Sequence, residues 1–351
     1  MQRSYILVTG GAGFIGTNVA RSYLQEGTSV HVLDNLSRAG VEQNIAELTR
    51  EYPGQVLFTE GDVRDRSAVE RAVSSATAVY HLAAQVAVTT SLDDPEADLQ
   101  TNLIGTMNVL EAIRRSPFRP PLLFTSTNKV YGKLAPVALG ECALRYQPAR
   151  DTQATKGVNE DQPLEFLSPY GCSKGSADQY VLDYARSYGL PATVFRMSCI
   201  YGPYQMGSED QGWVAHFLRQ ALKEEPITIY GDGKQVRDLL FVGDLVNAMR
   251  LAVDKIAGVS GEAFNVGGGT ANSVSLLEVI EQINALTGRN VSLHRGPERL
   301  GDQRWYVSDI SKVSAYLQWS PGVGVPEGLR TLYNWYLGRA PLITQDEVQI
   351  A

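Results

Sequence analysis

The chain has few cysteines and histidines, and their scarcity excludes several kinds of site. Its three cysteines, Cys142, Cys172 and Cys199, are odd in number and far apart in the sequence, so we expect no disulfide framework. The four histidines never approach the spacing of a zinc-binding motif. We therefore expect no bound metal ion.

Long hydrophobic runs and clustered positive charge are also missing. No stretch reaches the roughly 18 apolar residues that a membrane-spanning helix needs. The apolar segment 5–16 is rich in glycine and follows no basic region, unlike a signal peptide. The formal net charge of −7 argues against nucleic acid or an anionic membrane as a partner, because both attract clusters of Lys and Arg. We expect a cytoplasmic protein that binds any phosphate group through a few local side chains.

The 351 residues are 44% hydrophobic and 20% charged, which is typical of a globular protein with one large domain or two smaller ones. Strand-like and helix-like segments alternate through most of the chain. This alternation predicts an α/β protein with a doubly wound parallel (Rossmann) sheet. We expect that domain in residues 1–195 and about 235–268, and a smaller C-terminal substrate-binding lobe from about 196–234 and 269–351.

The N-terminal segment has the order strand, glycine turn, helix. Residues 5–9 read as a buried strand, and Gly10, Gly13 and Gly16 follow with G-x-x-G-x-x-G spacing. In a dinucleotide-binding turn, one glycine permits the tight bend, one lets the backbone approach a pyrophosphate, and one lets helix and strand pack closely. A glycine turn alone also occurs in FAD-binding proteins and in purely structural settings.

The second predicted strand favours NAD as the dinucleotide. Residues 29–33 end at Asp34, where a carboxylate can accept hydrogen bonds from both ribose hydroxyls and repels a 2′-phosphate. Arg38 lies close by in sequence and weakens this preference over NADP. Two of the expected NAD contacts have plain alternatives: Asp62 is then the cap of a helix, and Asn102 is an ordinary surface amide. The remaining expected NAD contacts are Phe14, Ile15, Asn35, Asp62, Val63, Leu82, Ala83, Ala84, Asn102 and Thr125.

Tyr170 and Lys174 lie four residues apart at the start of the helix-like segment 168–188. On a helix this spacing puts both side chains on one face, so we expect the ammonium group to lower the pKa of the phenol from its usual value of about 10. A phenolate near neutral pH acts as a base. The same spacing also occurs in ordinary amphipathic helices with a solvated lysine, so the neighbouring motifs decide its meaning.

Those motifs resemble one enzyme family. GGAGFIG, the acid after the second strand, TSTNKVYG and SPYGCSK together are similar to the extended short-chain dehydrogenase/reductase family of nucleotide-sugar epimerases and dehydratases. The resemblance implies an NAD-dependent enzyme that acts on a nucleotide-diphosphate sugar as a homodimer or homotetramer. It also implies that Thr127 is the catalytic hydroxyl, Tyr170 the base, and Lys174 the residue that bonds the nicotinamide ribose.

Two positions beside Thr127 separate reaction types within this family. Members that eliminate water carry Asp-Glu there, because elimination needs an acid and a base, whereas this chain has Asn128 and Lys129. The strings STNKVYG, SPYGCSKGSADQYVLDYAR and DQGW resemble the CDP-paratose 2-epimerase branch, which implies epimerisation at C2 through a transient 2-keto sugar. That branch has histidine and serine where Met197 and Cys199 stand. The alternatives are a 4-epimerase or reductase of the same fold, and a non-catalytic NAD-binding regulatory protein.

The resemblance also implies which residues bind the nucleotide sugar. Arg237 suits a diphosphate, because a guanidinium group bonds two oxygens at once, and Trp213 can stack on a flat ring. A surface ion pair and a core tryptophan are the plain alternatives. The polar stretch 145–165 reads as a surface excursion or as a loop over the sugar. The expected substrate contacts are Asn128, Lys129, Cys199, Trp213, Tyr230, Gln235, Arg237 and Arg304.

Overall fold

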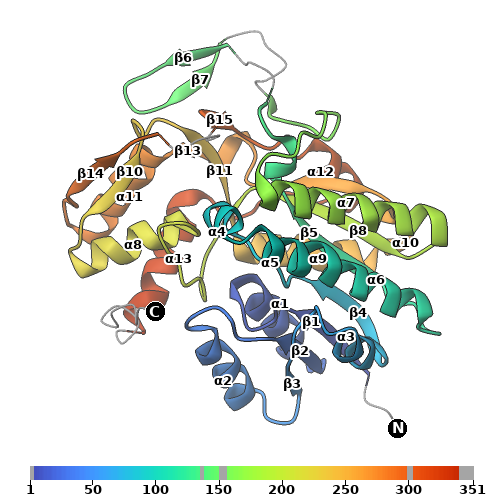
Figure 1. Ribbon diagram of the computed structural model, residues 1–351. Helices are drawn as coiled ribbons and strands as arrows, with labels where there is room; N and C mark the ends of the chain where they lie inside the picture. The colour runs from blue at the N-terminus through green and yellow to red at the C-terminus, as the bar shows by residue number, and fades with distance from the viewer. Residues whose placement is uncertain (1–3, 135–137, 150–155, 299–302, 340–351) are drawn as a thin grey trace.

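A seven-stranded parallel sheet forms the centre of the protein (Figure 1). The computed structural model describes residues 4–134, 138–149, 156–298 and 303–339. Most strands are buried and rich in apolar residues, as expected of a parallel sheet covered on both faces. Their order is β12-β8-β5-β4-β1-β2-β3. The strands are β1 (Tyr5–Thr9), β2 (Val30–Asp34), β3 (Val56–Glu60), β4 (Ala76–His81), β5 (Leu122–Thr127), β8 (Ala192–Met197) and β12 (Ala263–Val266).

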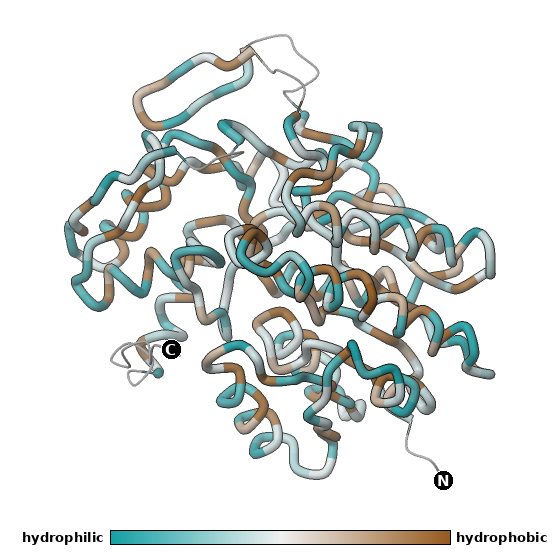
Figure 2. Tube along the Cα trace, in the orientation of Figure 1, coloured by the Kyte–Doolittle hydropathy of each residue, from teal (hydrophilic) through white to brown (hydrophobic). Residues whose placement is uncertain are grey.

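Helices cover both faces of this sheet and enclose two separate apolar cores. The predicted doubly wound α/β fold is therefore confirmed. Figure 2 shows that the helices carry hydrophilic as well as hydrophobic residues, as expected where one helical face is buried and the other faces water. One face is covered by α1 (Phe14–Leu24), α2 (Val41–Glu51), α9 (Val242–Asp254) and α12 (Ser311–Leu317), and the other by α3 (Arg66–Val73), α6 (Gly105–Arg115) and α7 (Ser168–Tyr188).

A smaller lobe is built from later segments of the chain around a third apolar core. In its main sheet, β11 (Val236–Phe241) pairs with β9, β13 and β15. Segment 235–268 thus supplies β12 to the large sheet and β11 to the small one, and the division of the chain into two lobes remains our proposal. The other elements are β9 (Cys199–Tyr201), β13 (Ser273–Ser275), β15 (Trp305–Tyr306), the parallel pair β10 (Ile227–Tyr230) and β14 (Leu293–Gly296), and the helices α8 (Trp213–Lys223), α11 (Leu276–Thr287) and α13 (Val325–Leu337).

The polar stretch after β5 contains a short hairpin, β6 (Leu139–Glu141) and β7 (Tyr146–Pro148), which packs against the small lobe (Figure 1). The Tyr146 hydroxyl donates a hydrogen bond to Asp232 at 2.5 Å. Lys234 Nζ lies 2.6 Å from Glu141 Oε1. The hairpin is thus joined to the turn between β10 and β11. Residues 150–155 of the stretch lie outside the described residues.

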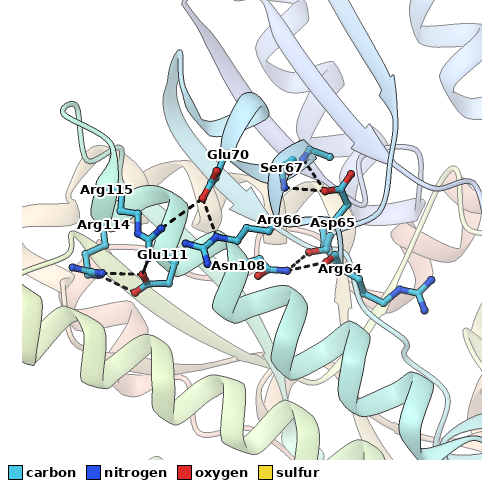
Figure 3. Close-up of polar contacts among 11 residues, drawn as sticks. Arg64, Asp65, Arg66, Ser67, Glu70, Asn108, Glu111, Arg114 and Arg115 are labelled. Atoms are coloured by element: carbon cyan, nitrogen blue, oxygen red, sulfur yellow. Dashed lines mark hydrogen bonds and ion pairs between the residues drawn. The ribbon is translucent and has the colours of Figure 1, made fainter.

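Polar side chains join α3 to α6 on the surface of the large domain (Figure 3). Glu70 lies 2.9 Å from Arg66 Nε and 3.9 Å from Arg115 Nη1. Asn108 Nδ2 donates to the carbonyl oxygens of Val63 at 2.9 Å and Arg64 at 3.2 Å. Helix α6 therefore holds the loop that follows β3.

A buried ion pair joins α7 to β8. Arg196 contacts Asp178 through Nε and Nη2, each at 2.9 Å, and the two side chains are only 6% and 0% exposed. Asp178→Asn should lower the free energy of unfolding by about 3 kcal/mol, because it leaves a buried guanidinium group without its counter-charge.

Chemical denaturation measures this loss, with Glu70→Gln as the control. Glu70 is 44% exposed in its ion pair with Arg66, so its substitution should cost less than about 1 kcal/mol. Similar losses for both variants would contradict the role given to the buried pair.

Candidate active site

The glycine turn lies where the strand order of the large sheet reverses, between β1 and β4, which is the usual ligand site of a doubly wound sheet. Gly10 has φ +69°, and a Cβ atom there would lie 2.7 Å from the Ala83 nitrogen. A Cβ atom on Gly16 would lie 2.3 Å from the Gly10 carbonyl oxygen. Gly13 precedes α1, and Phe14 and Ile15 begin it. The turn therefore fits a pyrophosphate at the start of α1.

Asp34 ends β2 beside this turn, as expected of a ribose-binding acid. Its Oδ2 accepts a hydrogen bond from the Ala12 nitrogen at 3.0 Å, and its Oδ1 accepts one from the Leu36 nitrogen at 2.9 Å. Burial raises the pKa of Asp34, and the backbone hydrogen bonds act against that shift. Arg38 instead donates to Gln211 of the small lobe.

Three of the expected NAD contacts come together after β2 and β3. Asn35 Nδ2 donates to Asp62 Oδ2 at 2.9 Å, and Val63, the residue after Asp62, is buried. The Arg64 guanidinium bonds both oxygens of Asp62 and lowers the pKa of that carboxyl to about 2. Asp62 is not the helix cap considered above, because Asp65 caps α3.

Buried polar side chains brace the end of β4, where Leu82, Ala83 and Ala84 follow. His81 contacts Thr9 Oγ1 at 2.7 Å and Thr106 Oγ1 at 3.0 Å. Burial lowers the pKa of His81 to about 3, so its imidazole is neutral at pH 7. The sequence analysis missed this network, although a histidine that ends an apolar strand was a visible signal.

Asn102 is 1% exposed, so the interpretation of it as a surface amide is wrong. Its Oδ1 accepts from the Gln85 nitrogen at 2.9 Å, and its Nδ2 donates to the Gln85 carbonyl oxygen at 3.0 Å. Asn102 thus holds the loop after β4 in place beside the glycine turn.

Thr127, Tyr170 and Lys174 converge at the end of β5. Thr127 is the last residue of β5 and is hydrogen-bonded to Tyr170, which lies in the first turn of α7. Lys174 Nζ donates to the Thr125 carbonyl oxygen at 2.6 Å and lies 4.3 Å from the centre of the Phe124 ring. All three side chains are buried. The set can bind and exchange a proton with a hydroxyl group that is shielded from water.

The expected effect of Lys174 on Tyr170 is wrong for this structure. Burial raises the pKa of Tyr170 to about 12, the hydrogen bond from Thr127 opposes the rise, and the charge of Asp98 adds to it. Burial lowers the pKa of Lys174 to about 7. The physical reason is that the ammonium group contacts a carbonyl oxygen and an aromatic ring, so it is not directed at the phenol.

Four of the expected substrate residues meet at the junction with the small lobe. Cys199 is hydrogen-bonded to Trp213 and lies in the electric field of Arg237 and Lys129. Burial raises the pKa of the Cys199 thiol, and the two cations oppose this rise. Arg237 is only 6% exposed. Two positive charges, opposed by the carboxylate of Asp238, therefore act on the residue that is bonded to the indole ring, and such a group suits a nucleotide diphosphate.

The other expected substrate residues lie in different places around this group. Asn128 is buried next to Thr127, with its Oδ1 3.4 Å from Thr127 Oγ1. Gln235 Nε2 donates to the Tyr230 carbonyl oxygen at 2.9 Å. Arg304 is exposed, and its guanidinium carbon lies 5.5 Å from the centre of the Tyr146 ring. Arg304 thus stands against the hairpin, outside the buried group.

No group of three or more His, Cys, Asp or Glu side chains in the described ranges could hold a metal ion. No helix in them is long and apolar enough to span a membrane.

Residues 6–267 match the NAD dependent epimerase/dehydratase family. The chain belongs to this family. Its cofactor is therefore NAD, and its activity is that of an NAD-dependent nucleotide-sugar epimerase or dehydratase. The glycine turn, with its two positions that exclude any side chain, and Asp34 fit this cofactor.

Similar proteins cover nearly the whole chain. CDP-paratose 2-epimerase of Salmonella typhi is 40% identical over 337 residues, which cover 94% of this chain and 98% of that protein. dTDP-glucose 4,6-dehydratase of Xanthomonas campestris pv. campestris is 35% identical over 353 residues, which cover 94% and 92% of the two chains. The structure of UDP-glucose 4-epimerase from Thermotoga maritima with UDP-glucose is similar with a TM-score of 0.82, at 33% identity, and covers 96% of this chain and 99% of that chain.

Tyr170→Phe should lower turnover at least about 100-fold, because it removes the expected proton acceptor and leaves a ring that packs as before. The fold and the bound NAD should be retained. Turnover of a nucleotide sugar, and mass spectrometry of the cofactor released from the protein, measure the two outcomes.

Tyr316→Phe is the matched control, since Tyr316 is 46% exposed on α12. It should leave turnover unchanged. Activity of Tyr170→Phe within a few-fold of the parent would remove Tyr170 from the mechanism.

Proposed function

We propose that the protein epimerises a nucleotide-activated deoxysugar at C2 through a transient 2-keto sugar. The observation that carries this proposal is the pair Asn128 and Lys129 after the catalytic threonine. Asn128 is buried against Thr127, where elimination of water would need a carboxylic acid, and an amide cannot donate a proton at neutral pH. The similarity to a CDP-paratose 2-epimerase supports the same reaction.

In this proposal the two hydroxyl groups at the end of β5 bind the sugar. Thr127 Oγ1 and the Tyr170 hydroxyl hold the C2 oxygen, and Tyr170 removes its proton and later returns it. Lys174 supplies positive charge and bonds the nicotinamide ribose. Bound NAD supplies the hydride acceptor and donor and, when oxidised, a positive charge that favours ionisation of the phenol. Because the proton and the hydride both return to the sugar, no net oxidation results.

The nucleotide diphosphate is assigned to the junction with the small lobe. Arg237 and Lys129 supply positive charge beside Cys199, and Trp213 offers a ring for stacking. Arg304, held against Tyr146 of the hairpin, is close to solvent and contributes from the rim. An acidic protein thereby presents local positive charge to an anionic substrate.

One observation favours a 4-epimerase as the second candidate. Met197 pairs with Thr127 across the sheet, so it stands beside the catalytic hydroxyl, and it replaces the histidine expected of the 2-epimerase branch. Cys199 likewise replaces a serine. A non-catalytic NAD-binding role is disfavoured, because Thr127, Tyr170 and Lys174 are all present and converge.

Isotopic labelling of the substrate tests which carbon reacts. If C2 is oxidised and reduced again, a substrate deuterated at C2 should show a primary isotope effect and keep its deuterium at C2 of the product. Deuterium at C4 should have no effect on the rate. NMR of the product and the initial rates measure both.

An isotope effect from C4 with unchanged configuration at C2 would move the assignment to a 4-epimerase. The substrates for this comparison are CDP-, dTDP- and UDP-sugars with identical labels. The assignment of NAD and of Tyr170 would stand in either case.

We also propose that two copies of the chain pair through the helices beside the site. Leu99, Ile104 and Tyr180 are 43%, 39% and 44% exposed. They lie on α5 (Pro95–Leu99), on the π-helical turn Gln100–Ile104 that joins α5 to α6, and on α7, and these elements pack side by side (Figure 1). The extended short-chain dehydrogenase/reductase family, which the motifs resemble, pairs the corresponding helices across a two-fold axis.

Light scattering at micromolar concentration should therefore give the mass of a dimer or of a dimer of dimers. Ile104→Glu should shift the mass toward the monomer, because it adds a charge to the paired face. Leu57→Glu is the control, since Leu57 is 50% exposed on β3 at the edge of the sheet. A monomeric parent protein would rule the pairing out.

A further inference from the structure

A fully buried carboxylate lies beside the catalytic helix, and the proposed reaction assigns it no role. Asp98 is 0% exposed on α5, one turn before Asn102. The Ser173 hydroxyl donates a hydrogen bond to Asp98 Oδ2, and Asn102 Nδ2 donates to Asp98 Oδ1 at 3.1 Å. Ser173 directly precedes Lys174. The carboxylate is therefore attached to the segment that carries the proposed catalytic pair.

Burial of this carboxylate is costly, because Asp98 has no close cation. No Lys or Arg among the described residues forms an ion pair with Asp98 within 4.0 Å. Two neutral hydrogen-bond donors offset only part of the free energy that is needed to remove a carboxylate from water. Lys174 does act on Asp98 through its charge, from beyond contact distance. The two buried charges thus stabilise each other across the helix interface.

Lys174 has few other sources of negative charge. Its ammonium group touches the Thr125 carbonyl oxygen and the Phe124 ring, which carry only partial charges. The titratable groups that face it are Asp98 on α5, Asp178 and Tyr170 on α7, and His81 on β4.

Only the two carboxylates among these four groups supply negative charge at pH 7. Asp178 favours the ammonium form of Lys174 more strongly than Asp98 does, but its carboxylate is also paired with Arg196 through two contacts of 2.9 Å. Burial keeps the His81 imidazole neutral, and burial keeps the Tyr170 phenol protonated at pH 7. Asp98 is the negative charge in this group that no cation has taken up by direct contact.

The backbone also directs Asp98 toward α7. A π-helical turn, Gln100–Ile104, interrupts the path from α5 to α6, and such turns are frequent at functional sites. Asn102 Nδ2 in this turn lies 3.1 Å from Ser173 Oγ as well as 3.1 Å from Asp98 Oδ1. Ser173 Oγ also lies 3.2 Å from the Tyr170 carbonyl oxygen. The network fixes the first turn of α7 from the side of α5.

We propose that Asp98 is a positioning residue for the reaction: it holds the first turn of α7 through Ser173, and its charge balances the buried ammonium group of Lys174. The proposal rests on the proposed function of Tyr170 and Lys174. It predicts that Asp98 sets the pH range in which both groups work. A negative charge at this place favours the ammonium form of Lys174 and disfavours the phenolate form of Tyr170.

Asp98→Asn tests this role, because it removes the charge and nearly preserves the shape. Without the charge, the ammonium is less stable and the phenolate more stable, so both groups should lose their protons at lower pH. Both limbs of the pH profile of kcat/KM should therefore move down by about one pH unit. If the Asn variant does not fold, Asp98→Ser is the second variant, because it also removes the charge and has less bulk. It should move the limbs of the pH profile in the same direction.

Ser173→Ala is the matched control for the hydrogen bond. It removes the contact between α5 and α7 and leaves the carboxylate in place. It should lower kcat while the limbs of the pH profile stay close to those of the parent. Loss of activity in Asp98→Asn with unmoved limbs would show that Asp98 has only a structural role and would overturn the proposal.

NMR of protein labelled with 13C at lysine Cε gives a measurement that needs no turnover. The Lys174 signal is assigned by its loss in Lys174→Arg. In Asp98→Asn this signal should titrate at lower pH than in the parent. An unmoved titration contradicts the inference, whereas a moved titration in a protein that turns over no nucleotide sugar contradicts the proposed function alone.

Discussion

The hydrogen bond from the buried Lys174 ammonium to the Thr125 carbonyl oxygen is the contact on which the site depends. It ties α7 to β5, and so it brings Tyr170 against Thr127 at the end of that strand. It also holds the ammonium group in a buried position where water cannot solvate it. The surrounding carboxylates, and the helices that carry them, must then supply the stabilisation that water would give.

Features that depend on neighbouring residues in the chain could be predicted from the sequence. The glycine turn, the strand that precedes it and the acid at the end of β2 all follow one local pattern, and the structure places them together. The spacing of Tyr170 and Lys174 likewise predicted one helical face. The doubly wound sheet followed from the alternation of strands and helices, because parallel strands need crossover helices.

Features that depend on distant partners could not be predicted in this way. Asp98 and Ser173 are 75 positions apart, and no local spacing relates them. The direction of the Tyr170 pKa shift was wrong for the same reason, since it is decided by burial and by where the ammonium group points. The hairpin of β6 and β7, whose second strand lies in the stretch 145–165, was also missed, because its contacts lie on the small lobe and its own sequence has little periodicity.

The charges of the site are divided between its two sides, and this division bears on the reaction. Asp98 and Asp178 act on Lys174 from the helix side, whereas Lys129 and Arg237, opposed by the single carboxylate of Asp238, act on Cys199 on the side that we propose for the sugar nucleotide. Carboxylates at positions 128 and 129 would provide the acid and the base of an elimination, but they would also neutralise the positive charge that faces an anionic substrate. In the proposed reaction, an amide and an ammonium group there leave a field that attracts a diphosphate, and Tyr170 is the remaining proton-transferring group beside Thr127. Proton exchange at a single hydroxyl is sufficient for epimerisation through a keto sugar, since the same group takes the proton and returns it.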